Sequence, residues 1–236
     1  MAKREFILFI SDLQAPAMHR DTVPFLKALC KKYGKPTKVI QIGDEADQEA
    51  LNEYGKNPDL PSDGDEIEST IRTLRPIYNL FPKVDLLYSN HVLRARRKAR
   101  KAGLSKRRFK EWREVIEAPR GWRWYKSLYL TTSLGTTVFI CHGRSSNGLQ
   151  LAKELGSSVV QGHYHTKYGI EYTSNPAKLN FSMQIGCSID TRHEAFEYDS
   201  ENVKRPIIGH GAIINGFPKL LPMLLDKRGR WTGVVP

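Results

Sequence analysis

The sequence predicts an α/β fold, because apolar strand-like runs and amphipathic helices alternate over its first part. Continuous apolar runs typical of buried strands occupy residues 5–10, 38–42 and 84–88. Two segments with helical spacing of apolar residues lie between them: 22–34, which ends at a glycine, and 62–81, which begins with a capping motif. This order predicts parallel strands joined by crossover helices.

The rest of the chain is expected to be mainly strand. A basic helical segment at about 92–117 comes first, and one more helix is expected at 148–155. The expected strands are 122–130, 136–141, 159–161, 169–173, 179–185, 207–214 and 220–225. The sequence has no internal repeat, low-complexity segment or shift of composition, so residues 1–236 are expected to form a single domain.

The chain is strongly basic. It has 37 Lys and Arg against 25 Asp and Glu, a formal net charge of +12, and an isoelectric point near 9.6. Such an excess attracts polyanions, and charge alone leaves nucleic acid, acidic membrane surfaces and phosphorylated partners open.

Cysteines and apolar runs bear on location. Cys30, Cys141 and Cys187 have no metal-ligand spacing and fit buried, inert thiols in a reducing compartment. The apolar run near the amino terminus, residues 6–11, is too short for a signal peptide core or a membrane-spanning helix. We therefore expect a cytoplasmic protein with no membrane partner, and a homo-oligomer is left open.

Side chains of the types that bind metals follow the predicted strands directly. They are Asp12, Asp44, Asn90 with His91, His142, and His163 with His165. Each has an ordinary explanation as a cap, a turn or a satisfied histidine. Because the carboxyl ends of strands in an open α/β sheet meet at one edge, we expect these side chains to converge there.

Imidazole, carboxylate and amide ligands without thiolate suit borderline-hard divalent metals. Two such ions about 3.5–4 Å apart can polarise a phosphoryl group and offset its developing charge. We therefore expect two divalent ions, with Mn²⁺ first and Fe²⁺, Zn²⁺ or Ni²⁺ as alternatives.

The order of these motifs resembles that of the calcineurin-like metallophosphoesterases. That family has D-x-H, then G-D or G-D-x-x-D, G-N-H-D/E, a single His, and G-H-x-H. This sequence has Asp12-Leu13-Gln14, Gly43-Asp44, Ser89-Asn90-His91-Val92, His142-Gly143 and Gly162-His163-Tyr164-His165. The resemblance implies a four-layer α-β-β-α sandwich of two mixed sheets, with the metals at one sheet edge.

Within the family, three features are similar to a variant found in phage and prophage genomes. They are D-x-Q in place of D-x-H, the basic helix after Asn-His, and A-P-x-G-W at residues 118–122. For a phage-encoded protein the expected location is the host cytoplasm.

The resemblance implies a ligand role for each matching residue. Asp44 would bridge the two metals, and Asp12, Gln14 and His165 would complete one site. The other site would be completed by Asn90, His142 and His163. Gln14 stands where the family has His, and a glutamine oxygen binds metal more weakly, which favours a hard ion such as Mn²⁺.

The resemblance also implies how the reaction proceeds. His91 would act on the leaving oxygen as an acid or electrostatic stabiliser, and a hydroxide bridging the metals would attack the phosphorus without a covalent enzyme intermediate. Val92 replaces the acidic residue that usually follows this histidine, so another group must orient His91. Asp47 fits the G-D-x-x-D spacing, but Gln48-Glu49 replaces the Arg-Gly of protein serine/threonine phosphatases, which argues against that activity.

Residues 94–113 hold eleven Lys or Arg against one Glu, and they begin three residues after His91. The residues expected to bind nucleic acid are Arg94, Arg96, Arg97, Arg100, Lys101, Arg107 and Arg108. The rings of Trp122, Trp124 and Tyr125 follow and could stack on bases. The alternative is a solvated basic helix with a tryptophan-rich core contact.

The function expected first is that of a metal-dependent phosphodiesterase or nuclease acting on DNA, in preference to RNA. One alternative is a phosphatase or phosphodiesterase of nucleotides or other small phosphates. Another is a nucleic-acid-binding protein with a degenerate site. Retention of the acidic and histidine motifs favours the enzymes over the pure binder.

Overall fold

The computed structural model describes residues 5–52, 60–193 and 204–236, and their strands form two mixed sheets. The first sheet has the strand order β11-β10-β1-β2-β3-β4. Its strands are β1 (Phe6–Ile10), β2 (Lys38–Gln41), β3 (Lys83–Leu87), β4 (Gly121–Tyr125), β10 (Gly209–Ile214) and β11 (Phe217–Pro222). Strands β1 to β4 are parallel, whereas β10 and β11 run antiparallel to their neighbours.

The second sheet has the order β5-β6-β7-β9-β8. Its strands are β5 (Leu128–Thr131), β6 (Thr137–Cys141), β7 (Ser158–Gln161), β8 (Tyr168–Asn175) and β9 (Lys178–Ile185). Strands β6, β7 and β9 are parallel, and the edge strands β5 and β8 are antiparallel.

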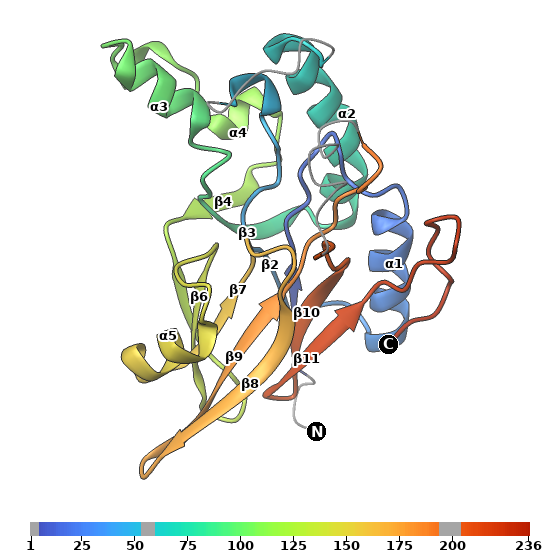
Figure 1. Cartoon of the computed structure of the whole chain (residues 1–236), viewed down its shortest axis with the longest axis vertical. Helices are drawn as coiled ribbons and strands as arrows, with labels where there is room; N and C mark the ends of the chain where they lie inside the picture. The colour runs from blue at the N-terminus through green and yellow to red at the C-terminus, as the bar shows by residue number, and fades with distance from the viewer. Residues whose placement is uncertain (1–4, 53–59, 194–203) are drawn as a thin grey trace.

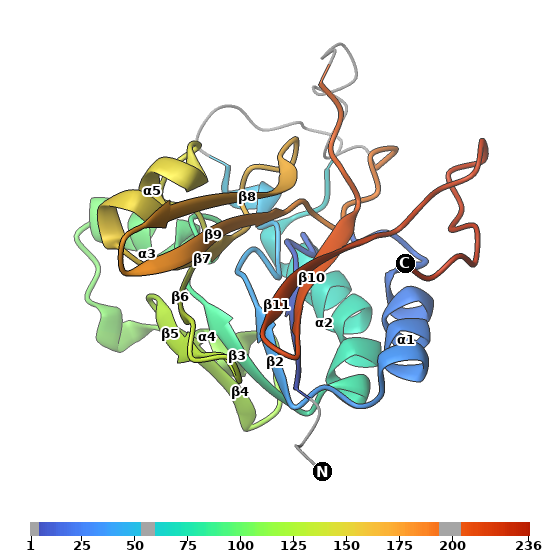
Figure 2. The ribbon, with the colours of Figure 1, turned by 90° about the horizontal axis from the view of Figure 1, so that it is seen from below.

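The described residues form five α-helices. They are α1 (Thr22–Tyr33), α2 (Asp63–Leu80), α3 (Arg94–Lys101), α4 (Trp112–Val115) and α5 (Gly148–Leu155), with 3₁₀ turns η1 (Glu49–Leu51) and η2 (Lys106–Arg108). Helices α1 and α2 lie on the first sheet and α5 on the second (Figures 1 and 2). The predicted α-β-β-α sandwich of two mixed sheets is thereby confirmed.

The alternation of side chains along β1 shows why this strand is apolar throughout. Phe6, Leu8 and Ile10 belong to the core that α1 and α2 cover. Ile7 and Phe9 belong to the core between the two sheets. Because successive side chains point to opposite faces, a strand buried on both faces must be apolar at every position.

One edge of the sandwich gathers the ends of strands from both sheets. The loop after β7 meets the loop after β1, because the His163 amide donates to Asp12 Oδ2 at 2.7 Å. The Gly162 amide donates to the carbonyl of His142, after β6, at 2.9 Å. The two sheets therefore deliver their polar loops to the same place.

Two predicted strands are corrected by the structure. The single strand predicted over 122–130 is two strands, β4 and β5, which pair with β3 and β6 in different sheets. Both pieces are rich in aromatic or aliphatic residues, and only Lys126 and Ser127 separate them, so the pattern does not reveal the crossing. The last strand is β11 at 217–222 rather than 220–225, because a tight turn with positive φ at Asn215 and Gly216 places Phe217 opposite Ile214.

The basic helical segment predicted at about 92–117 is three short helical pieces, α3, η2 and α4, instead of one helix. Helix α3 ends just before Gly103, whose φ of 71° is a left-handed conformation that glycine adopts easily. Residues 94–113, which we call the basic arm, extend away from the sheets at the upper left of Figure 1.

Among the described residues, no helix is long and apolar enough to cross a membrane. Cys141 and Cys187 are buried free thiols, as expected, whereas Cys30 is only half-buried. Burial raises the pKa of the Cys141 thiol to about 12, so this thiol is a poor nucleophile.

The carboxyl-terminal segment is tied to the start of α1 by one ion pair. Asp21 accepts hydrogen bonds from Nε and Nη2 of Arg230 at 2.7 and 2.6 Å and from the Trp231 amide at 2.9 Å. The hydrogen bonds from Arg230 lower the pKa of Asp21 to about 2 from an ordinary value of 3.8. The Trp231 ring packs edge-on against Phe25, 5.4 Å away.

We predict that Asp21→Asn lowers the melting temperature at neutral pH. Because the folded pKa of Asp21 is depressed, its stabilising effect is present above about pH 4 and is lost as the pH falls towards 2. The difference between wild type and variant in thermal unfolding should therefore shrink over that interval. Glu171→Gln, an exposed change on β8, is the control, and a difference that stays constant with pH would contradict the prediction.

Candidate metal centre

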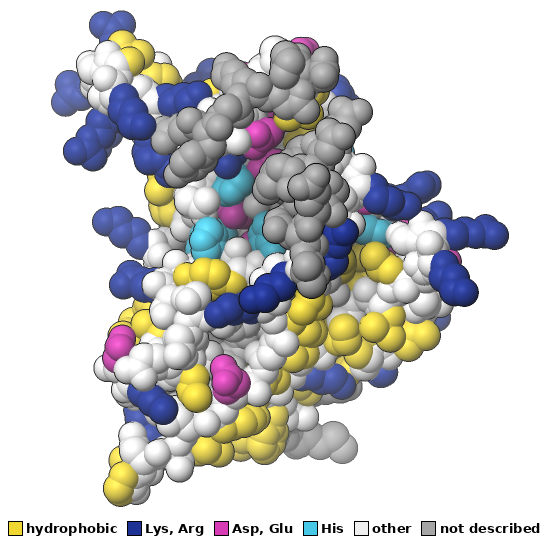
Figure 3. Space-filling view, in the orientation of Figure 1, with side chains coloured by type: hydrophobic (Ala, Val, Ile, Leu, Met, Phe, Trp, Pro, Cys, Tyr) yellow, Lys and Arg dark blue, Asp and Glu magenta, His cyan; other side chains and the backbone are white. Residues whose placement is uncertain are grey.

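The predicted metal ligands lie together in a hollow at the edge where the strand ends meet. Figure 3 shows histidine and acidic side chains gathered there, between the basic arm and the body of the sandwich. Two groups of side chains have ligand atoms close enough to hold a metal ion each, and they share Asp44.

The first group consists of Asp12, Asp44 and His165, whose ligand atoms lie within 4.8 Å of one another. His165 Nε2 is 3.1 Å from Asp12 Oδ2. Gln14 joins this group, because its Nε2 donates to Asp44 Oδ2 at 3.2 Å and its backbone amide donates to the carbonyl of Asp44. Asp12, Gln14 and Asp44 are all buried.

The second group consists of Asp44, His142 and His163, again within 4.8 Å. His142 Nδ1 donates to the carbonyl of Ile42 at 3.0 Å, which leaves Nε2 to face the centre. His142 Nε2 lies 3.2 Å from Asp44 Oδ2 and 3.0 Å from Asn90 Oδ1. Asn90, predicted from the sequence, thus lies beside the second group.

Unpartnered oxygens show that the donors fit a cation. Asp12 Oδ1 and Gln14 Oε1 are buried, and neither has a hydrogen-bond partner in the described part of the chain. Buried polar atoms are almost always satisfied, so each such atom calls for an explanation. A metal cation can bind such oxygens directly, with no hydrogen bond needed. The mixture of carboxylate, amide and imidazole ligands suits Mn²⁺, Fe²⁺ or Zn²⁺.

The two buried carboxylates make the hollow a strong attractor for positive charge. Burial lowers the pKa of His142, but the charges of Asp44 and Asp12 outweigh it and raise the pKa to about 9. Burial likewise raises the pKa of Asp44, while His142 and His91 hold it well below its ordinary value. Protons on the histidines and divalent ions therefore compete for the same negative charge.

Left-handed backbone places three of the ligand residues. Gln14, Asp44 and His163 have φ values of 49°, 52° and 69°. Such conformations cost on the order of 1–3 kcal/mol each for residues other than glycine and persist where the surroundings enforce them. The backbone is bent here so that each side chain turns into the hollow at the end of its strand.

Glycines next to the ligands leave room for them. A Cβ on Gly43 would lie 2.7 Å from Nδ1 of His142, and one on Gly143 would lie 2.5 Å from Cβ of His163. A Cβ on Gly162 would lie 2.6 Å from Oδ1 of Asp12. The glycines of G-D, H-G and G-H-x-H are therefore required by close approach, since a methyl group would displace a ligand.

His91 lies at the rim of the hollow and is oriented by Asp47. Its Nδ1 is 2.9 Å from Asp47 Oδ1 and donates to the Asp47 carbonyl at 2.7 Å. Its Nε2 faces the centre, 3.9 Å from Asp44 Oδ2. Asp47 thus supplies the orienting contact that Val92 cannot, and the G-D-x-x-D spacing was the sequence signal for it.

The sequence did not reveal how the basic arm is joined to the centre. Glu45, directly after Asp44, is buried, and its Oε1 accepts from the indole nitrogens of Trp112 and Trp124 at 2.7 and 2.8 Å. Burial raises the pKa of Glu45 to about 7. Arg94 donates to the carbonyls of Asp47 and Gln48 at 3.0 Å.

The tryptophans after the arm are structural. Trp122 is 1% exposed, and its indole nitrogen donates to the carbonyl of Phe81. Trp124 is held by Glu45, and Tyr125 packs against the core between the sheets. The expectation of stacking on bases is corrected for Trp122, whose ring is buried in the core, whereas Trp124 is half-buried and packs against the same core.

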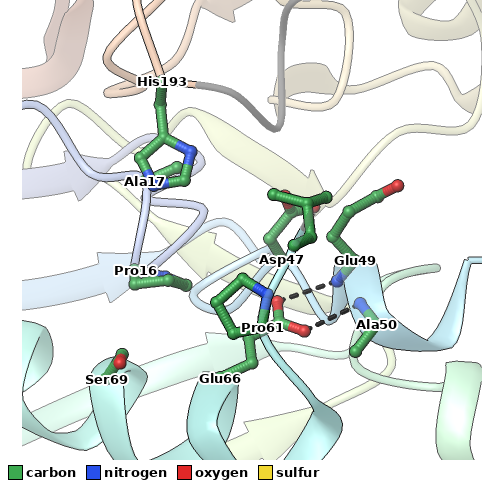
Figure 4. Close-up of a pocket in the computed structure, with 10 residues that line it drawn as sticks. Pro16, Ala17, Asp47, Glu49, Ala50, Pro61, Glu66, Ser69 and His193 are labelled. Carbon is green, nitrogen blue, oxygen red and sulfur yellow. Dashed lines mark hydrogen bonds between the residues drawn. The ribbon is translucent and has the colours of Figure 1, made fainter. Parts of the chain in front are cut away.

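A small cavity of about 160 Å³ lies beside Asp47 (Figure 4). Glu66 of α2 lines it and accepts hydrogen bonds from the Glu49 and Ala50 amides, both at 2.8 Å. Glu49 in turn pairs with Arg94 at 3.4 Å. The carboxylate of Glu66 therefore holds η1 in place, and η1 in turn binds Arg94 through Glu49.

The other histidines do not belong to either ligand group. His19 bonds to the Gly229 carbonyl through Nε2 and accepts from the Asp21 amide through Nδ1. His210 is 1% exposed, and burial lowers its pKa to about 3, so it is a neutral, structural side chain.

The residues predicted to bind nucleic acid divide into two sets. In the first set, the guanidinium groups bind other parts of the protein. Arg94 and Arg97 point back to the centre, and Arg97 donates to the Asn90 carbonyl at 2.8 Å, while Arg96 pairs with Glu111 at 2.7 Å. The remainder are exposed on the arm, and they are Arg100, Lys101, Arg107 and Arg108.

Comparison with solved structures gives distant similarities of shape. The chain is similar to Vps29 from Chaetomium thermophilum, with 15% identity and a TM-score of 0.48 over 98% of this chain and 96% of that one. It is similar to a metallophosphoesterase from Sphaerobacter thermophilus, with 12% identity and a TM-score of 0.42 over 92% and 87% of the two chains.

A third similarity is to a phosphopantetheinyl hydrolase from Mycobacterium tuberculosis, with 11% identity and a TM-score of 0.36 over 86% of this chain and 95% of that one. No protein-family model and no curated protein matches the sequence. At these identities and TM-scores, the similarities assign no activity to the chain.

We predict that Gly162→Ala weakens metal binding by about 10- to 100-fold, the range seen when contacts that orient a ligand are lost. The added methyl group would lie 2.6 Å from Asp12 Oδ1 and displace it. Titration calorimetry of metal-stripped protein with Mn²⁺ measures the effect. Gly169→Ala is the matched control, because nothing lies within 4 Å of its new Cβ. Equal metal affinities of the two variants would show that the added methyl group does not displace Asp12.

Proposed function

We propose that this protein is a metal-dependent phosphodiesterase with a dinuclear centre, and that its substrate is DNA. The observation that carries the proposal is the pair of ligand groups that share Asp44, with buried, unpartnered oxygens on Asp12 and Gln14. A purely structural polar cluster would pair those oxygens with donors of the protein.

The ligands divide between two positions. Asp12, Gln14 and His165 would hold one ion, and Asp44 would be shared by both. The second ion would be held by Asn90, His142 and His163. Divalent ions in these positions, with Mn²⁺ first, would neutralise the phosphoryl oxygens and activate a water molecule for attack.

His91 is the residue that would act on the leaving oxygen. Asp47 fixes the ring through Nδ1, so Nε2 is held toward the hollow for proton donation to that oxygen. Arg94 Nη2 lies 3.5 Å from Nε2 and adds positive charge beside the position of the phosphoryl group. Asp47 and Arg94 therefore position and support His91 without contacting the phosphorus.

The basic arm supports a polyanionic substrate. It begins three residues after His91, and most of its cations are exposed, so a phosphodiester backbone lying along it would pass the hollow. Phosphate contacts of this kind bind DNA without regard to sequence and position it for cleavage.

We predict Mn²⁺-dependent hydrolysis of bis-(p-nitrophenyl) phosphate by metal-stripped protein, at rates well above those for p-nitrophenyl phosphate. Asp44→Asn should reduce the diester rate by at least about 100-fold, because the shared carboxylate is lost. His91→Ala should reduce kcat by roughly 10²- to 10⁴-fold with metal content unchanged, as expected for loss of a general acid.

Other outcomes would redirect the proposal. Preference for the monoester would identify a phosphatase of small phosphates. Absence of hydrolysis with two metals bound, together with indifference of DNA binding to His91→Ala, would identify a nucleic-acid-binding protein. Metal content measured by mass spectrometry separates a dead enzyme from an unloaded one.

We also predict that salt separates the two kinds of substrate. Cleavage of DNA should fall steeply between low and physiological salt, because each phosphate that the arm neutralises contributes about −0.7 to −0.9 to the slope of log affinity against log salt. Hydrolysis of the small diester in the same buffers should change little. Equal salt dependence of both substrates would exclude the arm from DNA binding.

A further inference from the structure

The basic arm encloses a cavity of its own, away from the metal ligands. Helix α3 and turn η2 fold over a space of about 490 Å³, which we call the arm cavity. Its apolar surface comes from Ala99, Leu104 and Phe109. This volume lies within the range of small-ligand sites.

Two apolar side chains at the arm cavity are exposed to solvent. Leu104 and Phe109 are 47% and 43% exposed. The sequence analysis assigned base stacking to Trp122 and Trp124, but Trp122 is buried and Trp124 half-buried, whereas the Phe109 ring is exposed. An exposed ring among cations favours a ligand with both a flat apolar face and negative charge.

The cations around the arm cavity supply the complementary charge. Arg100, Lys106, Arg107 and Lys110 line it, and within the described residues none of them has an ion-pair partner. The acidic group of the cavity, Glu111, is already paired with Arg96 at 2.7 Å. The net charge of the cavity is therefore strongly positive.

The arm cavity is held at a fixed place relative to the metal centre. At one end, Arg94 is bound to Asp47 and Gln48 and Arg97 to Asn90. At the other, the indole of Trp112 is bound to Glu45. Helix α3 has eight residues and is therefore roughly 12 Å long. A DNA strand carries only a few phosphates over that distance.

We propose that the arm cavity binds an unstacked base and its flanking phosphates, and that the enzyme therefore selects single-stranded DNA. The inference rests on the proposed function, from which it takes DNA as the substrate. In a duplex the base faces are stacked inside, so only phosphates can reach the arm and the Phe109 ring has no partner. In a single strand a base can stack on Phe109 while its phosphates contact Arg100 and Arg107.

Binding measured in the Asp44→Asn background tests the proposal, because DNA is then bound without being cut. The probes are a fluorescein-labelled oligothymidylate of about twelve nucleotides and a duplex of the same length, followed by fluorescence anisotropy. The single strand should bind more tightly than the duplex. Adding Phe109→Ala should weaken binding of the single strand by roughly 5- to 100-fold and leave the duplex unchanged.

Matched variants separate stacking from charge and from folding. Phe217→Ala removes an aromatic ring that is 65% exposed on β11, and it should change neither DNA binding nor hydrolysis of the small diester. Arg100→Gln with Arg107→Gln should weaken binding of both probes and lower the salt slope by about two. Thermal unfolding of each variant confirms that the fold is intact.

Three results would overturn the inference. They are a Phe109→Ala effect no larger than that of Phe217→Ala, duplex binding as tight as single-strand binding, and no DNA binding at all. Failure of the proposed function has a different signature, namely no hydrolysis of the small diester by the wild-type chain while the Phe109-dependent binding remains.

Discussion

The structure at this edge of the sandwich depends on the need to compensate two buried carboxylates. Asp12 and Asp44 are inaccessible, and their oxygens lie within 4.8 Å in one ligand group. Like charges buried so close together are strongly unfavourable unless positive charge lies between or beside them. The carboxylates raise the pKa of His142 and so favour a proton there, and divalent ions would compensate the negative charge more fully.

That constraint explains the local backbone as well as the side chains. An ordinary turn does not require the left-handed conformations of Gln14 and Asp44, which are unfavourable for residues other than glycine. It does not require a glycine at position 162 either. They become understandable when each loop must present an oxygen or nitrogen to the same small volume, because a side chain only a methyl group larger would fill it. The sandwich core supplies the stability that offsets this local strain.

The metal centre and the basic arm form one connected structure. Glu45 follows the shared ligand directly and accepts hydrogen bonds from Trp112 of the arm and Trp124 of β4. Asp47 orients His91 and also binds Arg94, the first residue of α3. A displacement of the arm would therefore move His91, which suggests that substrate held by the arm and the group that acts on it are positioned together.

The sequence by itself determined the order of buried strands and the residue types at their ends, because burial on both faces demands apolar runs and the polar ligand residues then follow at the strand ends. This pattern predicted the α/β class and the side chains that meet in the hollow, including Asn90 and His163, whereas the sandwich of two sheets was implied by the resemblance of the motifs to a known family.

Only the tertiary structure decided which neighbours those side chains have. The crossing of 122–130 between sheets, the hydrogen bonds of Glu45 with Trp112 and Trp124, and the choice of Phe109 over Trp122 as the accessible ring all depend on contacts between segments far apart in the chain. Such contacts are set by packing geometry, which leaves no periodic signal in the residues that make them.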